Sequence, residues 1–147
     1  MIKPISTRRT RLITIGGHPI YSMLLPIPVV CFLGALLTDL TYLKSVGGLI
    51  WLAFSSWLLL VGLLVGVLAG IVLLVDFFRE RAMRTGPGWA HLFTFGSAML
   101  VQTANIFIHE RDGWTAVAGP GLILSIVGVV LILIAGWLHR PMTVVGR

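Results

Sequence analysis

Histidine and acidic side chains are the groups of this sequence that could carry acid–base, metal or haem chemistry. The chain has 4 histidines and 5 acidic residues among 147 residues. His18 and His91 each lie at the start of an apolar stretch, so both imidazoles would reach a similar depth on different helices. They are candidate ligands for haem b or a metal ion, with Asp76 holding one imidazole through a hydrogen bond. The alternative is structural: Asp76 pairs with Arg79, and His18 caps the first helix.

Polar residues recur at three- and four-residue steps from His91 to His109, which places them on one stripe of a helix. Because polar groups facing lipid are costly, this stripe should face the interior of a bundle. His91 and His109 lie roughly 27 Å apart along a helix, so they belong to different sites. The second site would form either interhelical hydrogen bonds or a pocket for a proton or a small ligand. Its residues are Asp39, Gln102, Asn105 and His109.

Motifs for catalysis are missing from the sequence. G-x-S-x-G, H-E-x-x-H, the P-loop and C-x-x-C do not occur. The single cysteine, Cys31, lies within an apolar run. The absence of C-x-x-C-H excludes a covalent c-type haem. We therefore predict that the protein is not an enzyme.

Four long apolar stretches must position these side chains. Hydrophobic residues make up 57% of the chain and charged residues 11%, whereas a typical soluble domain has about 25% charged residues. Each stretch is near or above the roughly 20 residues that cross the hydrocarbon core as a helix. We predict one all-α membrane domain, residues 1–147, folded as a four-helix transmembrane bundle. Its transmembrane helices are expected at about 19–43, 47–78, 89–108 and 114–138.

The basic residues predict how the bundle lies in the membrane. Nine of the 11 lysines and arginines fall in the N-terminal segment, the second loop and the C-terminal tail, and Lys44 and Arg111 fall in the other two loops. Since cytoplasmic loops carry an excess of positive charge, the N-terminus and C-terminus should both be cytoplasmic. The expected location is the bacterial cytoplasmic (inner) membrane, crossed several times. The net charge of +6 then reflects orientation and not nucleic-acid binding.

Gly62, Gly66 and Gly70 share one face of the second helix, because they are spaced by four residues. A face of small residues lets a neighbouring backbone approach closely. That neighbour is either another helix of the same chain or a second copy of the protein.

Several short segments resemble a known family. They are Gly17-His18-Pro19-Ile20 followed by Met23-Leu24-Leu25-Pro26-Ile27-Pro28, then Gly34-Ala35-Leu36-Leu37-Thr38-Asp39, Val75-Asp76-Phe77 and His109-Glu110-Arg111-Asp112-Gly113-Trp114. From about Gly17 to Trp137 the chain resembles the domain-of-unknown-function family 2231, uncharacterised bacterial membrane proteins with four helices. Members often carry a second His-Pro pair where this chain has Tyr21-Ser22. Some relatives are fused to Rieske or cytochrome c domains, which by resemblance implies work beside a membrane electron-transfer chain.

Three functions remain open at this point. The first is a non-enzymatic accessory or interaction subunit, which the packing glycines and the lack of catalytic motifs indicate. The second is a redox protein that holds haem b or a metal through His18 and His91, and the third is a small oligomeric transporter. The expected partners are the lipid bilayer and other membrane proteins, including a respiratory or photosynthetic electron-transfer complex.

Reporter fusions test the orientation that the basic residues predict. Fusions after Lys44 and Arg111 should report a periplasmic location, and fusions after Arg84 and Arg147 a cytoplasmic one, because basic residues are retained in the cytoplasm. One reporter active only in the periplasm and one active only in the cytoplasm give the measurement. A periplasmic signal at Arg84 would contradict the orientation.

Overall fold

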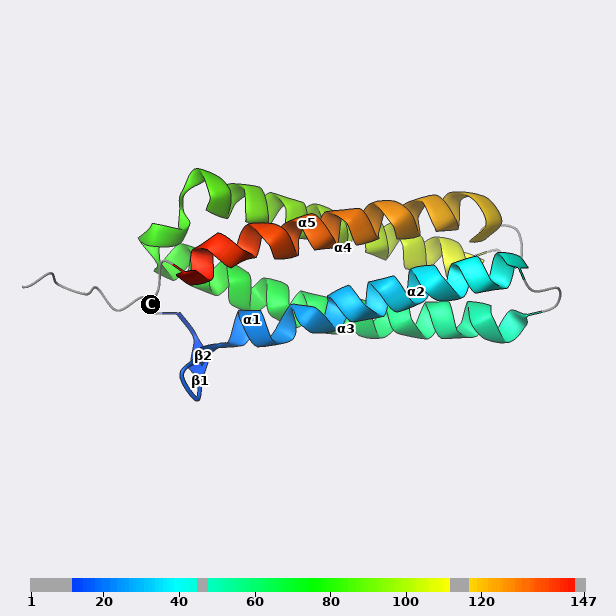
Figure 1. Ribbon diagram of the computed structural model, residues 1–147, viewed down its shortest axis with the longest axis horizontal. Helices are drawn as coiled ribbons and strands as arrows, with labels where there is room; N and C mark the ends of the chain where they lie inside the picture. The colour runs from blue at the N-terminus through cyan, green and yellow to red at the C-terminus, as the bar shows by residue number, and fades with distance from the viewer. Residues whose placement is uncertain (1–11, 45–47, 112–116, 145–147) are drawn as a thin grey trace, which may run out of the picture.

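The computed structural model describes residues 12–44, 48–111 and 117–144, and for Ala82 and residues 140–144 it describes the backbone alone. Four helices in these ranges are long and apolar enough to cross a membrane (Figure 1). They span Ile20–Lys44, Leu49–Arg79, Gly86–Arg111 and Val117–His139. The predicted all-α, four-helix transmembrane architecture is confirmed.

The elements follow one another along the chain as hairpin, helix, helix, helix, helix. The hairpin consists of β1 (Thr14–Ile15) and β2 (His18–Pro19). The first spanning segment consists of α1 (Ile20–Leu24) and α2 (Pro26–Lys44), the second is α3 (Leu49–Arg79), and the third is α4 (Gly86–Arg111). A short 3-10 turn, η1 (Arg81–Met83), joins α3 to α4. The fourth segment begins with a π-helical turn, η2 (Val117–Gly121), and continues as α5 (Leu122–Val144).

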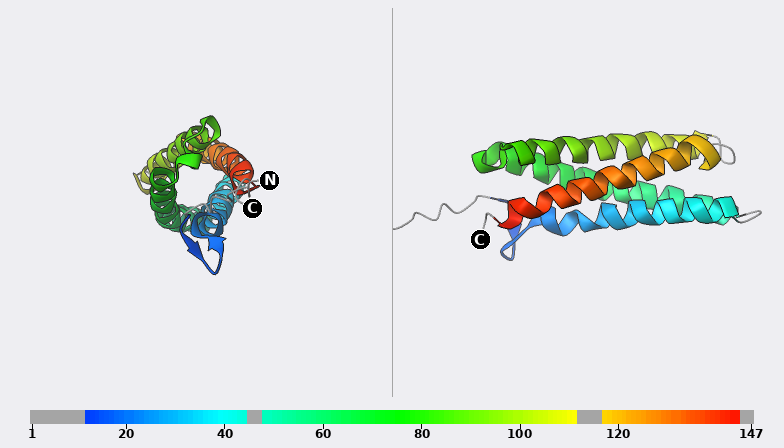
Figure 2. Two further views of the ribbon diagram at one scale, coloured as in Figure 1. Left: turned by 90° about the vertical axis from the view of Figure 1, so that its left-hand side faces the viewer. Right: turned by 45° about the horizontal axis from the view of Figure 1, so that its top comes forward.

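The spanning helices form an antiparallel ring in chain order. α2 packs against α3 and α5, and α4 packs against the same two helices. Viewed from the end, the helices surround a common axis (Figure 2). α1 begins and α5 ends at the same end of the bundle, called the terminal end below; α2 ends and η2 begins at the opposite, loop end (Figure 1). Residues of similar depth on all the helices can therefore meet in the interior.

Two prolines interrupt the first spanning segment at Leu25. Pro26 and Pro28 have no N–H group to donate to the carbonyl one turn earlier. The bond from Val29 N to Leu25 O is stretched to 3.5 Å, whereas Leu25 N still lies 2.9 Å from Tyr21 O. α1 thereby becomes a separate 5-residue turn at the terminal end, and it buries Tyr21.

The hairpin before α1 has no counterpart in the sequence prediction. Its strands are antiparallel and joined by Gly16 and Gly17, whose φ angles are +59° and +83°. Such positive values favour glycine and are typical of two-residue hairpin turns. Asp76, near the end of α3, accepts the backbone N–H of Ile13 at 2.9 Å. This bond ties the hairpin to the bundle.

The distribution of side chains is that of a protein in contact with lipid. Large apolar side chains face outward on every spanning helix; Trp57, Leu100 and Trp137 are 67%, 74% and 70% exposed. Polar side chains, including Asp39 and His91, are buried in the interior. A water-soluble domain buries its apolar residues and exposes most of its charged ones. The outer surface of this bundle therefore contacts the lipid bilayer.

The glycine face of α3 packs against other helices of the same chain. A side chain on this face would come closer to its neighbours than normal van der Waals contact allows. An added Cβ would lie 2.6 Å from the Phe32 ring at Gly62, 2.5 Å from Met99 Sδ at Gly66, and 3.3 Å from the Phe95 ring at Gly70. The close approach of helices at these glycines is thus made within one chain.

Gly62→Ala tests this packing. Because the buried Phe32 ring would have to move, the change should destabilise the protein by about 1–3 kcal/mol. The matched control is Gly96→Ala on α4, where an added Cβ would have nothing within 4 Å. That change should be neutral or should stabilise by up to about 1 kcal/mol through helix propensity. Unfolding midpoints in one detergent give the comparison, and equal losses would show that the glycine face is not a close contact.

Candidate functional site

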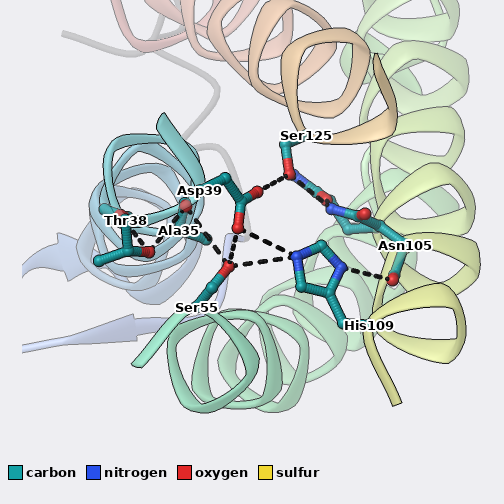
Figure 3. Close-up of polar contacts among 9 residues, drawn as sticks. Ala35, Thr38, Asp39, Ser55, Asn105, His109 and Ser125 are labelled. Carbon is teal, nitrogen blue, oxygen red and sulfur yellow. Dashed lines mark hydrogen bonds and ion pairs between the residues drawn. The ribbon is translucent and has the colours of Figure 1, made fainter. Parts of the chain in front are cut away.

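Asp39 of α2 is the centre of a buried hydrogen-bond network at the loop end (Figure 3). Its Oδ1 accepts a hydrogen bond from Ser55 Oγ of α3 at 2.5 Å and lies 3.0 Å from His109 Nε2 of α4. Its Oδ2 accepts one from Ser125 Oγ of α5 at 2.6 Å. A single carboxyl group, 1% exposed, thereby joins all the spanning segments of the bundle.

The contacts of His109 determine how many protons the Asp39–His109 pair carries. His109 Nδ1 lies 3.0 Å from the carbonyl oxygen of Asn105, and a carbonyl only accepts, so Nδ1 carries a hydrogen. Because lone pairs on both Nε2 and Asp39 Oδ1 would repel at their separation of 3.0 Å, we infer one further proton between them. The pair is either a carboxylate beside an imidazolium or a carboxylic acid beside a neutral imidazole. Both forms have zero net charge, which suits a site closed off from water.

Asn105 and Gln102 extend the network along α4 towards α5. Asn105 Nδ2 donates to Gln102 Oε1 at 3.0 Å and to Ser125 Oγ at 2.9 Å. Gln102 lies so close to α5 that a Cβ on Gly128 would be 2.5 Å from its amide group. Gln102 Nε2 and Asn105 Oδ1 are buried without a hydrogen-bond partner. The structure thus brings the four predicted residues of this half together in the interior.

Two serines complete the network, although neither was predicted as a site residue. Ser125 follows the helical steps of α5, but the sequence does not say which helix it faces. Ser55 lies in the apolar run of α3 and is fully buried. A hydroxyl group in hydrocarbon needs a hydrogen-bond partner. That requirement is the one property of the sequence that could have indicated both serines as members of a buried network.

At the terminal end, His91 contacts His139 and Tyr21. The ring centre of His91 lies 5.4 Å from the ring centres of both residues. His91 is fully buried, and its Nδ1 lies 2.8 Å from the carbonyl oxygen of Ala135. His18 is an exposed residue of the hairpin. The predicted pairing of His18 with His91 is replaced by a pairing of His91 with His139.

Three buried polar atoms of this second cluster lack a hydrogen-bond partner. His139 Nε2 lies 2.8 Å from Ser22 Oγ, but His139 Nδ1 has no hydrogen-bond partner. Tyr21 Oη and His91 Nε2 are likewise buried and without a partner. An unpaired buried polar group costs about 1–3 kcal/mol. The terminal cluster therefore carries an energetic cost that the Asp39 carboxyl avoids.

Haem b does not fit the histidines of the terminal cluster. Ligation by two histidines needs one imidazole on each face of the porphyrin. His91, His139 and Tyr21 are in mutual ring contact, with 4.9 Å between the ring centres of Tyr21 and His139, so the porphyrin has no room. Asp76, predicted to hold an imidazole, accepts the N–H of Ile13 instead. Within the described ranges, no three His, Cys, Asp or Glu side chains group to hold a metal ion.

An apolar layer separates the two polar clusters. Along the inward face of α4, the buried residues between His91 and Gln102 are Phe95 and Ala98. Phe32 of α2 fills the same interior and is fully buried. In the part of the chain that the structure describes, the two clusters are therefore separate.

Asp39→Ala tests whether the network holds the bundle together. The change removes the acceptor shared by Ser55, Ser125 and His109, and breaking a buried charged pair costs roughly 3–5 kcal/mol. The double variant Asp39→Ala/His109→Ala should recover part of this loss, because it leaves no uncompensated imidazole. Thr41→Ala is the control; Thr41 bonds only its own helix, at Leu37 O, and should change stability by less than about 0.5 kcal/mol. Unfolding in detergent measures all three, and a loss no larger than that of Thr41→Ala would contradict the role of Asp39.

Comparison with known proteins places the chain in a family. No curated protein and no solved structure matches it. Residues 17–145 match the family described as "Predicted membrane protein (DUF2231)". The matched range includes Asp39 and His109 of the loop end, and Tyr21, His91 and His139 of the terminal end. The resemblance noted in the sequence is confirmed: the chain belongs to the DUF2231 family of predicted membrane proteins.

Proposed function

We propose that this protein is a non-enzymatic accessory or interaction subunit of the bacterial cytoplasmic membrane, with both termini in the cytoplasm. One observation carries the proposal: the acidic centre of the bundle is closed. Both oxygens of Asp39 are bonded to side chains of other helices, and both nitrogens of His109 face acceptors. No acid, base or nucleophile of this network is left to act on a substrate.

The two atoms of the loop-end network that lack partners support the same conclusion. Gln102 Nε2 and Asn105 Oδ1 are amide atoms, which neither take up nor release protons near neutral pH. They can hold a water molecule, but they cannot perform acid–base catalysis. The network therefore favours a structural role.

The apolar layer between the clusters weighs against the transporter alternative. A transporter needs a polar path or a central binding site near the middle of the membrane. Here Phe32, Phe95 and Ala98 fill the described interior between the two polar clusters. The poor fit of haem b weighs in the same way against the haem-based redox alternative.

The outer surface is where an accessory subunit would act. Trp57, Phe107 and Trp137 are exposed on α3, α4 and α5, and flat aromatic side chains are favoured where proteins meet. Another membrane protein can pack against these rings in place of lipid. The resemblance to relatives fused with Rieske or cytochrome c domains makes a respiratory or photosynthetic electron-transfer complex the partner to test first.

The composition of the native particle tests the proposal. The tagged chain is produced at its natural level, extracted with a mild detergent, and separated first by size and then by charge. A second membrane protein should accompany it at a constant ratio through both steps, because an accessory subunit binds a defined partner. An unrelated four-helix membrane protein with the same tag controls for carry-over.

Two results would contradict this role. A particle built of this chain alone would favour the oligomeric transporter. A Soret band that shifts when dithionite is added would favour the haem-based redox protein. Mass spectrometry of the preparation identifies the proteins in the particle, and an absorption spectrum of the same preparation detects haem.

A further inference from the structure

The terminal cluster contains a concentration of unpartnered polar atoms that the proposed function does not use. Five buried side-chain atoms of the described residues lack a hydrogen-bond partner, and three of them belong to Tyr21, His91 and His139. These residues come from α1, α4 and α5, which are far apart in the sequence. Tyr21 and His91 are buried, His139 is partly buried, and the three rings contact one another. A single ligand that contacts all three atoms would satisfy them together.

The hydrogen bonds of the two imidazoles show which of their nitrogens are free to bind such a ligand. His91 Nδ1 must donate to the carbonyl oxygen of Ala135, so a neutral His91 has its lone pair on Nε2. His139 is held through Nε2 by Ser22 Oγ, which leaves Nδ1. A histidine that binds a metal is commonly held in this manner, with its other nitrogen bonded to a protein oxygen. Both imidazoles are thus arranged as metal-binding histidines are.

The spacing of the rings agrees with a shared ion. Two imidazoles on one tetrahedral ion, with metal–nitrogen bonds of about 2.0–2.1 Å, have ring centres roughly 5 Å apart. The centres of His91 and His139 are 5.4 Å apart. Tyr21 is 5.4 Å from one and 4.9 Å from the other. The phenol oxygen of Tyr21, which is buried without a hydrogen-bond partner, is available as a third donor.

We propose that Tyr21, His91 and His139 bind a single divalent transition-metal ion of the zinc or copper type. Two nitrogen donors and one phenol oxygen, with no carboxylate, suit these ions and not magnesium or calcium. Binding releases the phenol proton: the Tyr21 O–H bond breaks, an oxygen–metal bond forms, and one proton goes to solvent. The net charge of the filled site is therefore one unit lower than the charge of the free divalent ion.

Zinc uptake by the purified full-length chain in detergent tests the site. After treatment with chelator, loading with Zn²⁺ and gel filtration, wild type should retain about one Zn²⁺ per chain by elemental analysis. His91→Ala and His139→Ala should each weaken zinc affinity at least about tenfold. His18→Ala is the matched control, since His18 is exposed, and it should bind as wild type does. Mg²⁺ at the same concentration should not be retained.

Tyr21→Phe separates metal binding from simple packing, because it keeps the ring and removes only the oxygen. Wild type should release about one proton per Zn²⁺ in weakly buffered solution, and Tyr21→Phe should release almost none. Melting curves of every variant without metal show whether each one folds. If His91→Ala does not fold, His139→Ala and Tyr21→Phe still decide the matter.

The proposal fails if wild type retains no zinc, or no more zinc than folded His139→Ala retains. It also fails if folded His139→Ala and Tyr21→Phe bind zinc with wild-type affinity and proton release. These outcomes are independent of the accessory role, which depends on the native particle and on the Asp39 network.

Discussion

The hydrocarbon core of a membrane provides no hydrogen bonds, and the rest of this structure follows from that constraint. Backbone groups in lipid must be satisfied within their own segment, so each spanning segment is a helix. Polar side chains must find one another in the interior. Asp39 does so with partners from α3, α4 and α5, which makes one carboxyl group a contact point for the whole ring of helices. The apolar side chains face lipid, where contact with hydrocarbon carries no penalty for them.

Association of helices in lipid has no hydrophobic driving force, so close packing and polar contacts must supply it. The bundle uses both, at different depths. Gly62 lets α3 approach Phe32 of α2 near the middle, and the Asp39 network joins the helices at the loop end. At the terminal end, Tyr21 and His91 link α1 to α4 through ring contact. Each level of the bundle thus has its own means of holding neighbouring helices.

The four spanning helices could be predicted from the sequence because hydrophobic length depends on local composition. The stripe on α4 was also readable, since Gln102 and Asn105 follow the helical period and polar groups avoid lipid. Contacts between residues far apart in the chain could not be predicted from the sequence in the same way. His18 was expected beside His91, but the Gly16-Gly17 turn folds His18 into an exposed hairpin, and the ring arrangement brings His139 from α5 instead. A hairpin of two short strands has too few residues to leave a period in the sequence.

The zero net charge of the Asp39–His109 pair limits how this pair responds to the membrane potential. Moving one elementary charge across the full membrane is worth about 2.3 kcal/mol per 100 mV, which is how voltage sensors are driven. The pair as a whole experiences no such force. Transfer of its proton between His109 Nε2 and Asp39 Oδ1, which are 3.0 Å apart, covers only a small part of a field about 30 Å deep. As far as this pair is concerned, the bundle is equally stable in an energised and in a de-energised membrane.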